Sequence, residues 1–419
     1  MDDYSRDPQL DDLVRQLNSE PTAGESSDRP TVPAQPAPTA RSVPSGPPAI
    51  DPLDASSAAD SEVGEELATI LAHALAGGAS DLLLVGGLPP VIRIDGALKR
   101  LPAPPLAGEE IWGLLRGHLS ARGRRAYEER GAADFSLRLT GSDGGRRFRV
   151  NLHRQRGAPA AALRVLPQRV PRIEDLQLPV SLGELADARS GLLLVCGPAG
   201  SGKTTTLAAL VGEINGRRPC HIVTLEDPIE YEHRAERAVV EQIEIGRDSP
   251  SFAEALRAAL RQDPEVILVG EIRDLETMTT ALSAAETGHL ILASLHTRNA
   301  VQAVHRIVDV YPAAAQGQIR QQLATSLRAI VCQQLVPRQD GAGRVPAVEL
   351  LLSTVAVRNH IRNERAEKLT NELVLGKRLG MISMEDSLAG WVRAGVIDAA
   401  EARLRSSRPE EFDSLLAGH

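Results

Sequence analysis

Aromatic side chains and cysteines are scarce in this sequence of 419 residues. Phe, Tyr and Trp together make up 2% of it, which argues against the stacking platforms that proteins use to bind single-stranded nucleic acid. The net charge of −8 also lacks the basic excess that binds a phosphate backbone, so we expect no nucleic-acid partner. The cysteines, Cys196, Cys220 and Cys332, are far apart, and their spacing predicts neither a zinc site nor a disulfide framework.

Long hydrophobic runs are absent as well. No apolar run reaches the roughly 20 residues that a membrane-spanning helix needs, so we expect no transmembrane segment. The first residues, MDDYSRDPQL, are acidic and polar where a signal peptide would be basic and then apolar. The sequence therefore predicts a cytoplasmic protein that reaches a membrane only through a partner.

What is present divides the chain into four regions. Residues 1–60 are dominated by Pro, Ala, Ser and Thr, which predicts a disordered extension, because such a stretch buries too little apolar area to fold. Near its start, Leu10, Leu13 and Leu17 have helical spacing, so residues 8–17 form either a short docking helix or part of a polar tail. Residues 61–170 are predicted to form an α+β domain, residues 171–352 an α/β domain, and residues 353–419 a helical C-terminal segment.

The α/β prediction rests on buried strands that alternate with glycine turns and helices. The segments GLLLVC, HIVTLE, EVILVG and LILASLH are apolar enough to be covered on both faces, as in a doubly wound parallel sheet. The segment ATSLRAIVCQQLV, residues 324–336, is predicted to be helical, like the chain after residue 352. In the preceding domain we expect a helix over residues 65–77 and two paired strands in RRFRVNLHRQRG and AAALRVLP.

The strongest chemical signal is the glycine-rich segment GPAGSGKTTT, which follows the strand that ends at Cys196. It has the pattern GxxxxGK[ST] between a strand and a helix, which is typical of a loop that binds nucleotide phosphates with its backbone N–H groups. The lysine would reach the β- and γ-phosphates of ATP, and the threonine after it would bind Mg²⁺. The predicted nucleotide-binding residues are Gly197, Pro198, Ala199, Gly200, Ser201, Gly202, Lys203, Thr204 and Thr205.

A second acidic element, LEDPIEYEH, follows the next strand at its carboxyl end, where open α/β sheets bind ligands. Glu226 and Asp227 are candidates to bind the metal, with Thr204, or to orient its waters. Glu230 is a candidate to polarise the attacking water. The alternative interpretation is a solvated turn capped by the aspartate.

The third and fourth strands each end in one candidate catalytic residue. Glu271, in GEIRD, stands at the strand tip where a carboxylate would align and deprotonate a water beside the nucleotide. Its alternative role is a salt bridge to Arg273. His296 follows the fourth strand and is a candidate sensor of the γ-phosphate, against a purely structural role.

Together these segments resemble a known family. GPAGSGKTTT, LEDPIEYEH, LVGEIRDLETMTTALSAAETGH and ASLHT are similar to the Walker A motif, Asp box, Walker B motif and His box of secretion and pilus ATPases. GGASDLLLVGGLPPVIRIDGAL, RIVDVYP and LGMISMEDSLAGWVRAGVI resemble the retraction ATPases of type IV pili. The absence of a tetracysteine cluster and the segment VAVRNHIRNERAEKL favour that branch over extension and secretion ATPases.

The resemblance implies a fold and an assembly. The first domain would be PAS-like and the second RecA-like, and six copies would form a ring with nucleotide held between the domains. Among the arginines of the paired strands, Arg149 and Arg164 are candidates to reach the phosphates. The implied activity is Mg²⁺-dependent ATP hydrolysis that powers pilus retraction and twitching motility, with an inner-membrane platform protein as partner and peripheral association with that membrane.

Some positions depart from the retraction ATPases. His360 stands where the family usually has leucine, Asn363 where it usually has glutamate, and Leu83 where it has histidine. A nucleotide-binding regulatory paralogue of the retraction ATPase is therefore kept as the alternative function. A nucleic-acid translocase with the same kind of ring is a third alternative, which the acidic composition and the few aromatics disfavour.

Overall fold

The computed structural model describes residues 63–94, 96–140, 145–341 and 343–418. The predicted extension of residues 1–60, with its candidate docking helix, lies outside the described residues. Within the described residues, no helix is both long enough and apolar enough to cross a membrane.

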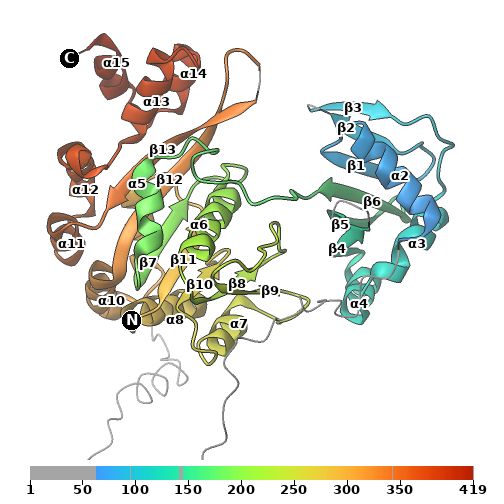
Figure 1. Ribbon diagram of the computed structural model, residues 1–419, viewed down its shortest axis with the longest axis horizontal. Helices are drawn as coiled ribbons and strands as arrows, with labels where there is room; N and C mark the ends of the chain where they lie inside the picture. Colours follow the sequence, from blue (N-terminus) through green and yellow to red (C-terminus); the bar gives the residue numbers. More distant parts are fainter. Residues whose placement is uncertain (1–62, 95, 141–144, 342, 419) are drawn as a thin grey trace, which may run out of the picture. The chain divides into compact units, whose positions relative to one another are not determined.

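The first sheet is antiparallel and has the strand order β3-β2-β1-β6-β5-β4 (Figure 1). The predicted helix over residues 65–77 is present as α2, and the two predicted paired strands are present as β5 and β6. Its core is largely aliphatic, with leucines of α2 and α3 packed on the buried face of the sheet, and it also holds the buried rings of Phe148 and Tyr127. The elements are α2 (Glu65–Ala76), β1 (Asp81–Val85), β2 (Val91–Ile94), β3 (Ala97–Arg100), α3 (Gly108–Leu115), α4 (Ala121–Arg130), β4 (Ala132–Leu139), β5 (Arg146–Gln155) and β6 (Ala158–Val165).

The second sheet has seven strands in the order β13-β12-β7-β11-β10-β8-β9. Its pairs are parallel except for the edge strand β13, which runs antiparallel to β12. The sheet is therefore mixed, and the carboxyl ends of β7, β11, β10 and β8 lie along one edge. The strands are β7 (Gly191–Cys196), β8 (His221–Glu226), β9 (Val239–Glu244), β10 (Val266–Val269), β11 (Leu290–Leu295), β12 (Leu327–Pro337) and β13 (Arg344–Leu352).

Helices cover both faces of this sheet, because the strands are apolar on both. Leu193 and Val195 of β7 pack with α5 and α6, whereas Leu192 and Leu194 pack in the core that holds α7 to α10. This is the doubly wound arrangement that continuous apolar strands predict. The helices are α5 (Val180–Glu184), α6 (Lys203–Arg217), α7 (Phe252–Ala259), α8 (Leu275–Glu286), α9 (Ala300–Asp309) and α10 (Ala313–Ser326).

One secondary-structure prediction is wrong. Residues 324–336 were predicted to be helical, but α10 ends at Ser326 and Leu327–Pro337 form strand β12. An apolar run of this length is consistent with either a buried helix or a buried strand, and only tertiary context decides between them. Here the run lies between β7 and β13, where both of its edges find backbone hydrogen-bond partners.

After β13 the chain is helical, as expected. A separate apolar cluster joins α13 and α15 to β12 and β13 through Val336, Ala347, Leu388 and Phe412. On α13, the buried carboxylate of Glu385 accepts hydrogen bonds from the Arg408 guanidinium and the Ser406 hydroxyl. The helices are α11 (Val355–Arg362), α12 (Leu369–Leu375), α13 (Met384–Arg393), α14 (Ala399–Arg405) and α15 (Pro409–Ala417).

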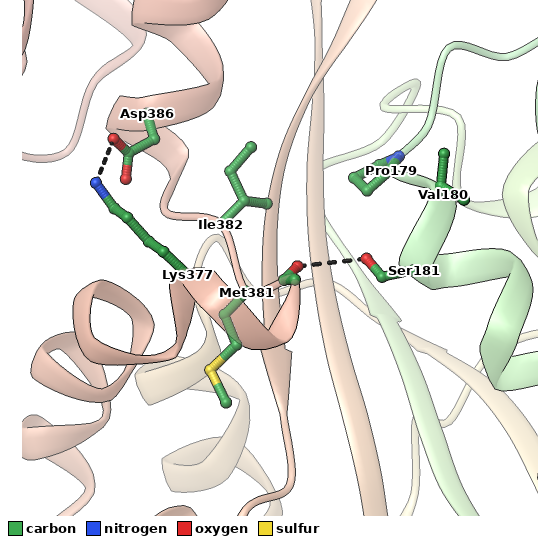
Figure 2. Close-up of a pocket in the computed structure, with 8 residues that line it drawn as sticks. Pro179, Val180, Ser181, Lys377, Met381, Ile382 and Asp386 are labelled. Atoms are coloured by element: carbon green, nitrogen blue, oxygen red, sulfur yellow. Dashed lines mark hydrogen bonds and ion pairs between the residues drawn. The ribbon is translucent and has the colours of Figure 1, made fainter.

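A surface cavity of about 450 Å³ lies where the start of α5 faces the chain between α12 and α13 (Figure 2). The Ser181 hydroxyl donates to the Gly380 carbonyl at 3.3 Å across it, and Lys377 pairs with Asp386 at 2.8 Å on its rim. None of its lining residues belongs to the glycine-rich loop or to the strand tips beside it.

Candidate active site

The glycine-rich loop joins β7 to α6, as the sequence predicts. All three of its glycines adopt backbone angles that other residues rarely adopt, with φ of 149° at Gly197, 74° at Gly200 and 89° at Gly202. Helix α6 begins at Lys203, so its positive end faces the loop. Thr204 and the stretch 198–200 are exposed, whereas Ser201 is buried, and its hydroxyl oxygen has no hydrogen-bond partner in the described part of the chain.

Lys203 is folded onto the loop. Its Nζ donates to the carbonyl oxygens of Gly197 and Pro198, at 2.9 and 3.0 Å. Burial lowers the pKa of Lys203, and the negative charge of Glu271 partly opposes that shift. The Glu271 carboxylate, which follows β10, therefore acts electrostatically on Lys203, which follows β7.

Glu271 is held from two sides. His296 donates from Nε2 to Glu271 Oε1 at 2.9 Å, and Arg273 pairs with Oε2 at 2.6 Å. The hydrogen bond from Arg273, with a smaller contribution from His296, holds the pKa of Glu271 below its usual value. Glu271 is thus an ionised carboxylate with Arg273 as ion-pair partner and His296 as a second contact, so the salt bridge considered for it is present, and its role as a base stays a prediction.

The acidic element after β8 is divided between buried and accessible carboxylates. Glu226 is buried and accepts hydrogen bonds from Thr224 at 2.7 Å and Gln242 at 3.1 Å, and burial raises its pKa. Asp227 is exposed, and its negative charge contributes to the raised pKa of Arg273. Tyr231 from the same element contacts Thr205 of the loop with its hydroxyl at 3.1 Å.

Glu230 faces the arginines that the sequence singled out. Burial raises the pKa of Glu230, and the charges of Arg149 and Arg164 oppose that shift. The Arg164 guanidinium also pairs with Asp81 at 3.0 Å and stays 70% exposed.

Two further arginines were not predicted to matter. Arg147 donates to the Ile229 carbonyl at 2.9 Å and, with Arg138, pairs with Glu232. Their signal in the sequence was present but weak, since β5 carries basic residues at Arg146, Arg147, Arg149 and Arg154, and alternation alone does not tell which of them have partners.

Two polar side chains on β12 and β13 were missed altogether. Gln333 is 4% exposed, and its side chain contacts the loop and α6. Glu349 is 5% exposed and accepts a hydrogen bond at 2.7 Å from the backbone N–H of Ala300, just after His296 in the chain. A buried polar residue within an expected strand would have been the signal, but the wrong helix prediction for residues 324–336 concealed Gln333.

The strand tips therefore bring the loop, His296, Glu271 and the acidic element to one edge of a doubly wound sheet. A glycine-rich loop between a buried strand and a helix, with a carboxylate at a neighbouring strand tip, is the arrangement of the class of P-loop nucleotide-binding proteins.

Comparison with known proteins gives the family within that class. Residues 57–390 match the model of the type II/IV secretion system protein family, and the chain belongs to that family. It is 41% identical over 347 residues to the type IV pilus retraction ATPase PilT of Pseudomonas aeruginosa, covering 83% of this chain and 100% of that protein. It is also 45% identical over 327 residues to the uncharacterized protein YggR of Escherichia coli, covering 78% and 98%.

A solved structure agrees with the sequence comparison. The crystal structure of the pilus retraction motor PilT with bound ADP superposes with a TM-score of 0.78 at 43% sequence identity. The match covers 83% of this chain and 99% of that one.

Proposed function

We propose that this protein is an ATP-hydrolysing motor that powers type IV pilus retraction and hence twitching motility. The observation that carries the proposal is the ionised Glu271, held by His296 and Arg273 and interacting with Lys203 of the glycine-rich loop. Similarity to PilT over most of both chains supports the biological role.

The chemistry follows from these side chains. The backbone N–H groups of residues 197–204 and the positive end of α6 bind the phosphates, and Lys203 leaves the two loop carbonyls to bind the γ-phosphate. Glu271 accepts a proton from water as the water oxygen bonds to the γ-phosphorus. The bond from that phosphorus to the bridging oxygen breaks, and ADP leaves with the pair of electrons. His296 fixes the Glu271 carboxylate and is placed to sense the γ-phosphate.

The residues present fit Mg²⁺, whose preferred ligands are oxygens. When bound, Mg²⁺ would neutralise charge on the β- and γ-phosphates. Thr204, exposed at the start of α6, would hold it, and Asp227, also exposed, would orient its water ligands. Glu226 is also a candidate ligand, but its Oε1 already accepts hydrogen bonds from Thr224 and Gln242. We therefore propose that it helps to hold Asp227, the next residue in the chain, in position.

We further propose the assembly that the resemblance implies. Residues 61–170 form a PAS-like domain, residues 171–352 a RecA-like domain and residues 353–419 a helical segment, with residues 1–60 as an extension. The antiparallel sheet with α2 and α3 on its buried face supports the first assignment. Six copies form a cytoplasmic ring that acts on an inner-membrane platform protein. Arg149 and Arg164, whose charges act on Glu230, reach the phosphates.

ATP hydrolysis by the purified full-length protein tests the enzymatic part. Glu271→Gln keeps the size and shape of the side chain but removes the base, so kcat should fall by about 10²–10⁴-fold while nucleotide still binds. Lys203→Ala should abolish both binding and turnover. A wild-type rate no higher than that of Lys203→Ala would overturn the proposal.

Imaging of labelled pili in the native host tests the biological part. A strain that carries Glu271→Gln at the chromosomal locus should display abundant pili that extend but do not retract. Normal retraction in that strain, with an active purified enzyme, would instead identify the regulatory paralogue.

A further inference from the structure

The side chain of Gln333, on strand β12, forms hydrogen bonds with the glycine-rich loop and with the start of helix α6. Its Nε2 donates to the Ser201 carbonyl at 2.8 Å, and its Oε1 accepts from the Thr206 hydroxyl at 2.8 Å. Both partners lie in or just after the loop, and the side chain is 4% exposed. The Ser201 carbonyl fixes which end of the amide faces which partner, because an amide turned over would place its own oxygen against that carbonyl oxygen with no donor between them.

The bond to the Ser201 carbonyl sets the direction of the next N–H group. In a planar trans peptide, the carbonyl of one residue and the N–H of the following residue point in opposite directions. Since the Ser201 carbonyl points toward Gln333, the Gly202 N–H points away from β12, toward the side of the loop where phosphates bind. A loop that binds an anion needs its N–H groups turned inward and its carbonyls turned outward.

Two glycines of the motif also lie against Gln333. A Cβ atom at Gly202 would lie 2.8 Å from Gln333 Nε2, and a Cβ at Gly197 would collide with the Gln333 backbone carbonyl. Both glycines also have positive φ angles. The loop is thus packed directly onto this one residue of β12, with no space for a side chain between them.

We propose that Gln333 is a positioning residue for nucleotide binding, which holds the Ser201–Gly202 peptide in the orientation that presents its N–H group to the phosphates. The inference rests on the proposed function, since it concerns the same nucleotide site. The Ser201 carbonyl requires a donor, and the glutamine amide supplies one while its oxygen accepts from the Thr206 hydroxyl. Methionine offers neither contact, and an ionised glutamate places a negative charge against the Ser201 carbonyl.

The test measures the dissociation constants of fluorescent ATP and ADP analogues, with steady-state ATPase kinetics, for the full-length protein. Gln333→Met should raise the dissociation constant by about tenfold, as expected for the loss of one or two buried hydrogen bonds, and should raise KM more than it lowers kcat. Gln333→Glu should bind worse still at pH about 8. Its affinity should recover at pH about 6, because a protonated carboxyl group donates to Ser201 as the amide does.

Two further variants distinguish a positioning role of Gln333 from a general loss of structure. Thr206→Val removes the hydroxyl that donates to Gln333 Oε1 but leaves the bond to Ser201, so it should give a smaller rise in the dissociation constant. Gln334→Met, at the next position of β12, loses a hydrogen bond to the Arg405 carbonyl and should bind nucleotide like the wild type. Binding by Gln333→Met and Gln333→Glu within twofold of the wild type would overturn the inference, as would an affinity of Gln333→Glu that does not recover at low pH. If the wild type itself fails to bind, the proposed function fails instead.

Discussion

At the scale of single residues, Arg273 lowers the pKa of the proposed catalytic base, Glu271. Its guanidinium lies 2.6 Å from Glu271 and is the largest cause of the low pKa of that carboxyl. A base must be ionised to accept a proton, so a low pKa keeps Glu271 active at lower pH. Arg273 therefore extends the acid side of the pH range over which the enzyme works.

Replacement of Arg273 should narrow that range. In Arg273→Gln the pKa of Glu271 rises, so the acid limb of the kcat/KM profile should move to higher pH, with little change at the alkaline end. The measurement is kcat/KM against pH, with Arg257→Gln as control, since Arg257 pairs with Glu276 on α8. An unchanged acid limb would mean that another group limits the rate.

Sequence patterns found the residues whose neighbours in the chain define their role. The loop residues 197–205 and Glu271 are adjacent to recognisable strands and glycines, so their positions follow from local rules. Gln333 lies 127 positions from Thr206, its partner, and no local pattern could pair them. The engagement of Glu226 by Gln242 was equally hidden, because the partner is on β9, an edge strand that the sequence analysis did not identify.

At the scale of elements, strand β13 anchors the start of helix α9 through Glu349. The carboxylate accepts from the Ala300 N–H, at the positive end of that helix. Burial, together with the nearby charge of Glu385, raises the pKa of Glu349 from 4.5 to about 7, against the opposing effect of the Ala300 hydrogen bond. Helix α9 directly follows the segment that carries His296, so the hydrogen bond from Ala300 to Glu349 helps to hold that part of the site in place.

The raised pKa predicts how stability depends on pH. The folded state binds a proton at Glu349 more tightly than the unfolded state, so this contribution to stability is complete below about pH 4.5 and is lost as pH rises to about 7. Glu349→Gln removes the titration. The mutant's midpoint of thermal unfolding, relative to the wild type, should therefore rise between pH about 5 and pH about 8.

The control for that experiment is Glu128→Gln on the exposed side of α4. Its unfolding midpoint should track the wild type at every pH. If Glu349→Gln also tracks the wild type, Glu349 does not titrate in this window.

Another element departs from its family in a way that the structure explains. His360 of α11 stands where retraction ATPases usually carry leucine, and its Nε2 lies 3.2 Å from a carboxylate oxygen of Glu372 on α12. This polar contact joins the two helices. The sequence could show the substitution but not its partner, because α12 approaches α11 only in the folded chain.

At the scale of the whole molecule, the proposed ring raises the question of which subunit supplies Arg164 to each nucleotide site. Arg164 is 70% exposed, so it is available to a neighbouring copy. Arg164→Ala and Glu271→Gln should each be inactive alone. If Arg164 acts on the neighbour's nucleotide, rings assembled from a mixture of the two should recover activity, because some interfaces then combine an intact Glu271 with an intact Arg164.

A second mixture of variants is the control for this recovery of activity. A mixture of Glu271→Gln and Lys203→Ala should stay inactive if both groups belong to the same subunit's site. Mass measurement of the mixtures should show a species about six times the 44.8 kDa of one chain. Failure of the Arg164→Ala mixture to recover, in rings of that mass, would place the arginine in its own subunit's site.

The position of β7 in the middle of the sheet has a consequence for how this protein can be divided. A fragment that ends at Ser326 would contain every motif that carries the chemistry, yet it would lack β12 and β13. Strand β7 would then be an edge strand, with a row of unpaired backbone groups where Ala329 to Cys332 now pair with it. A piece cut to the catalytic groups alone would therefore expose an apolar strand edge that invites pairing with another chain.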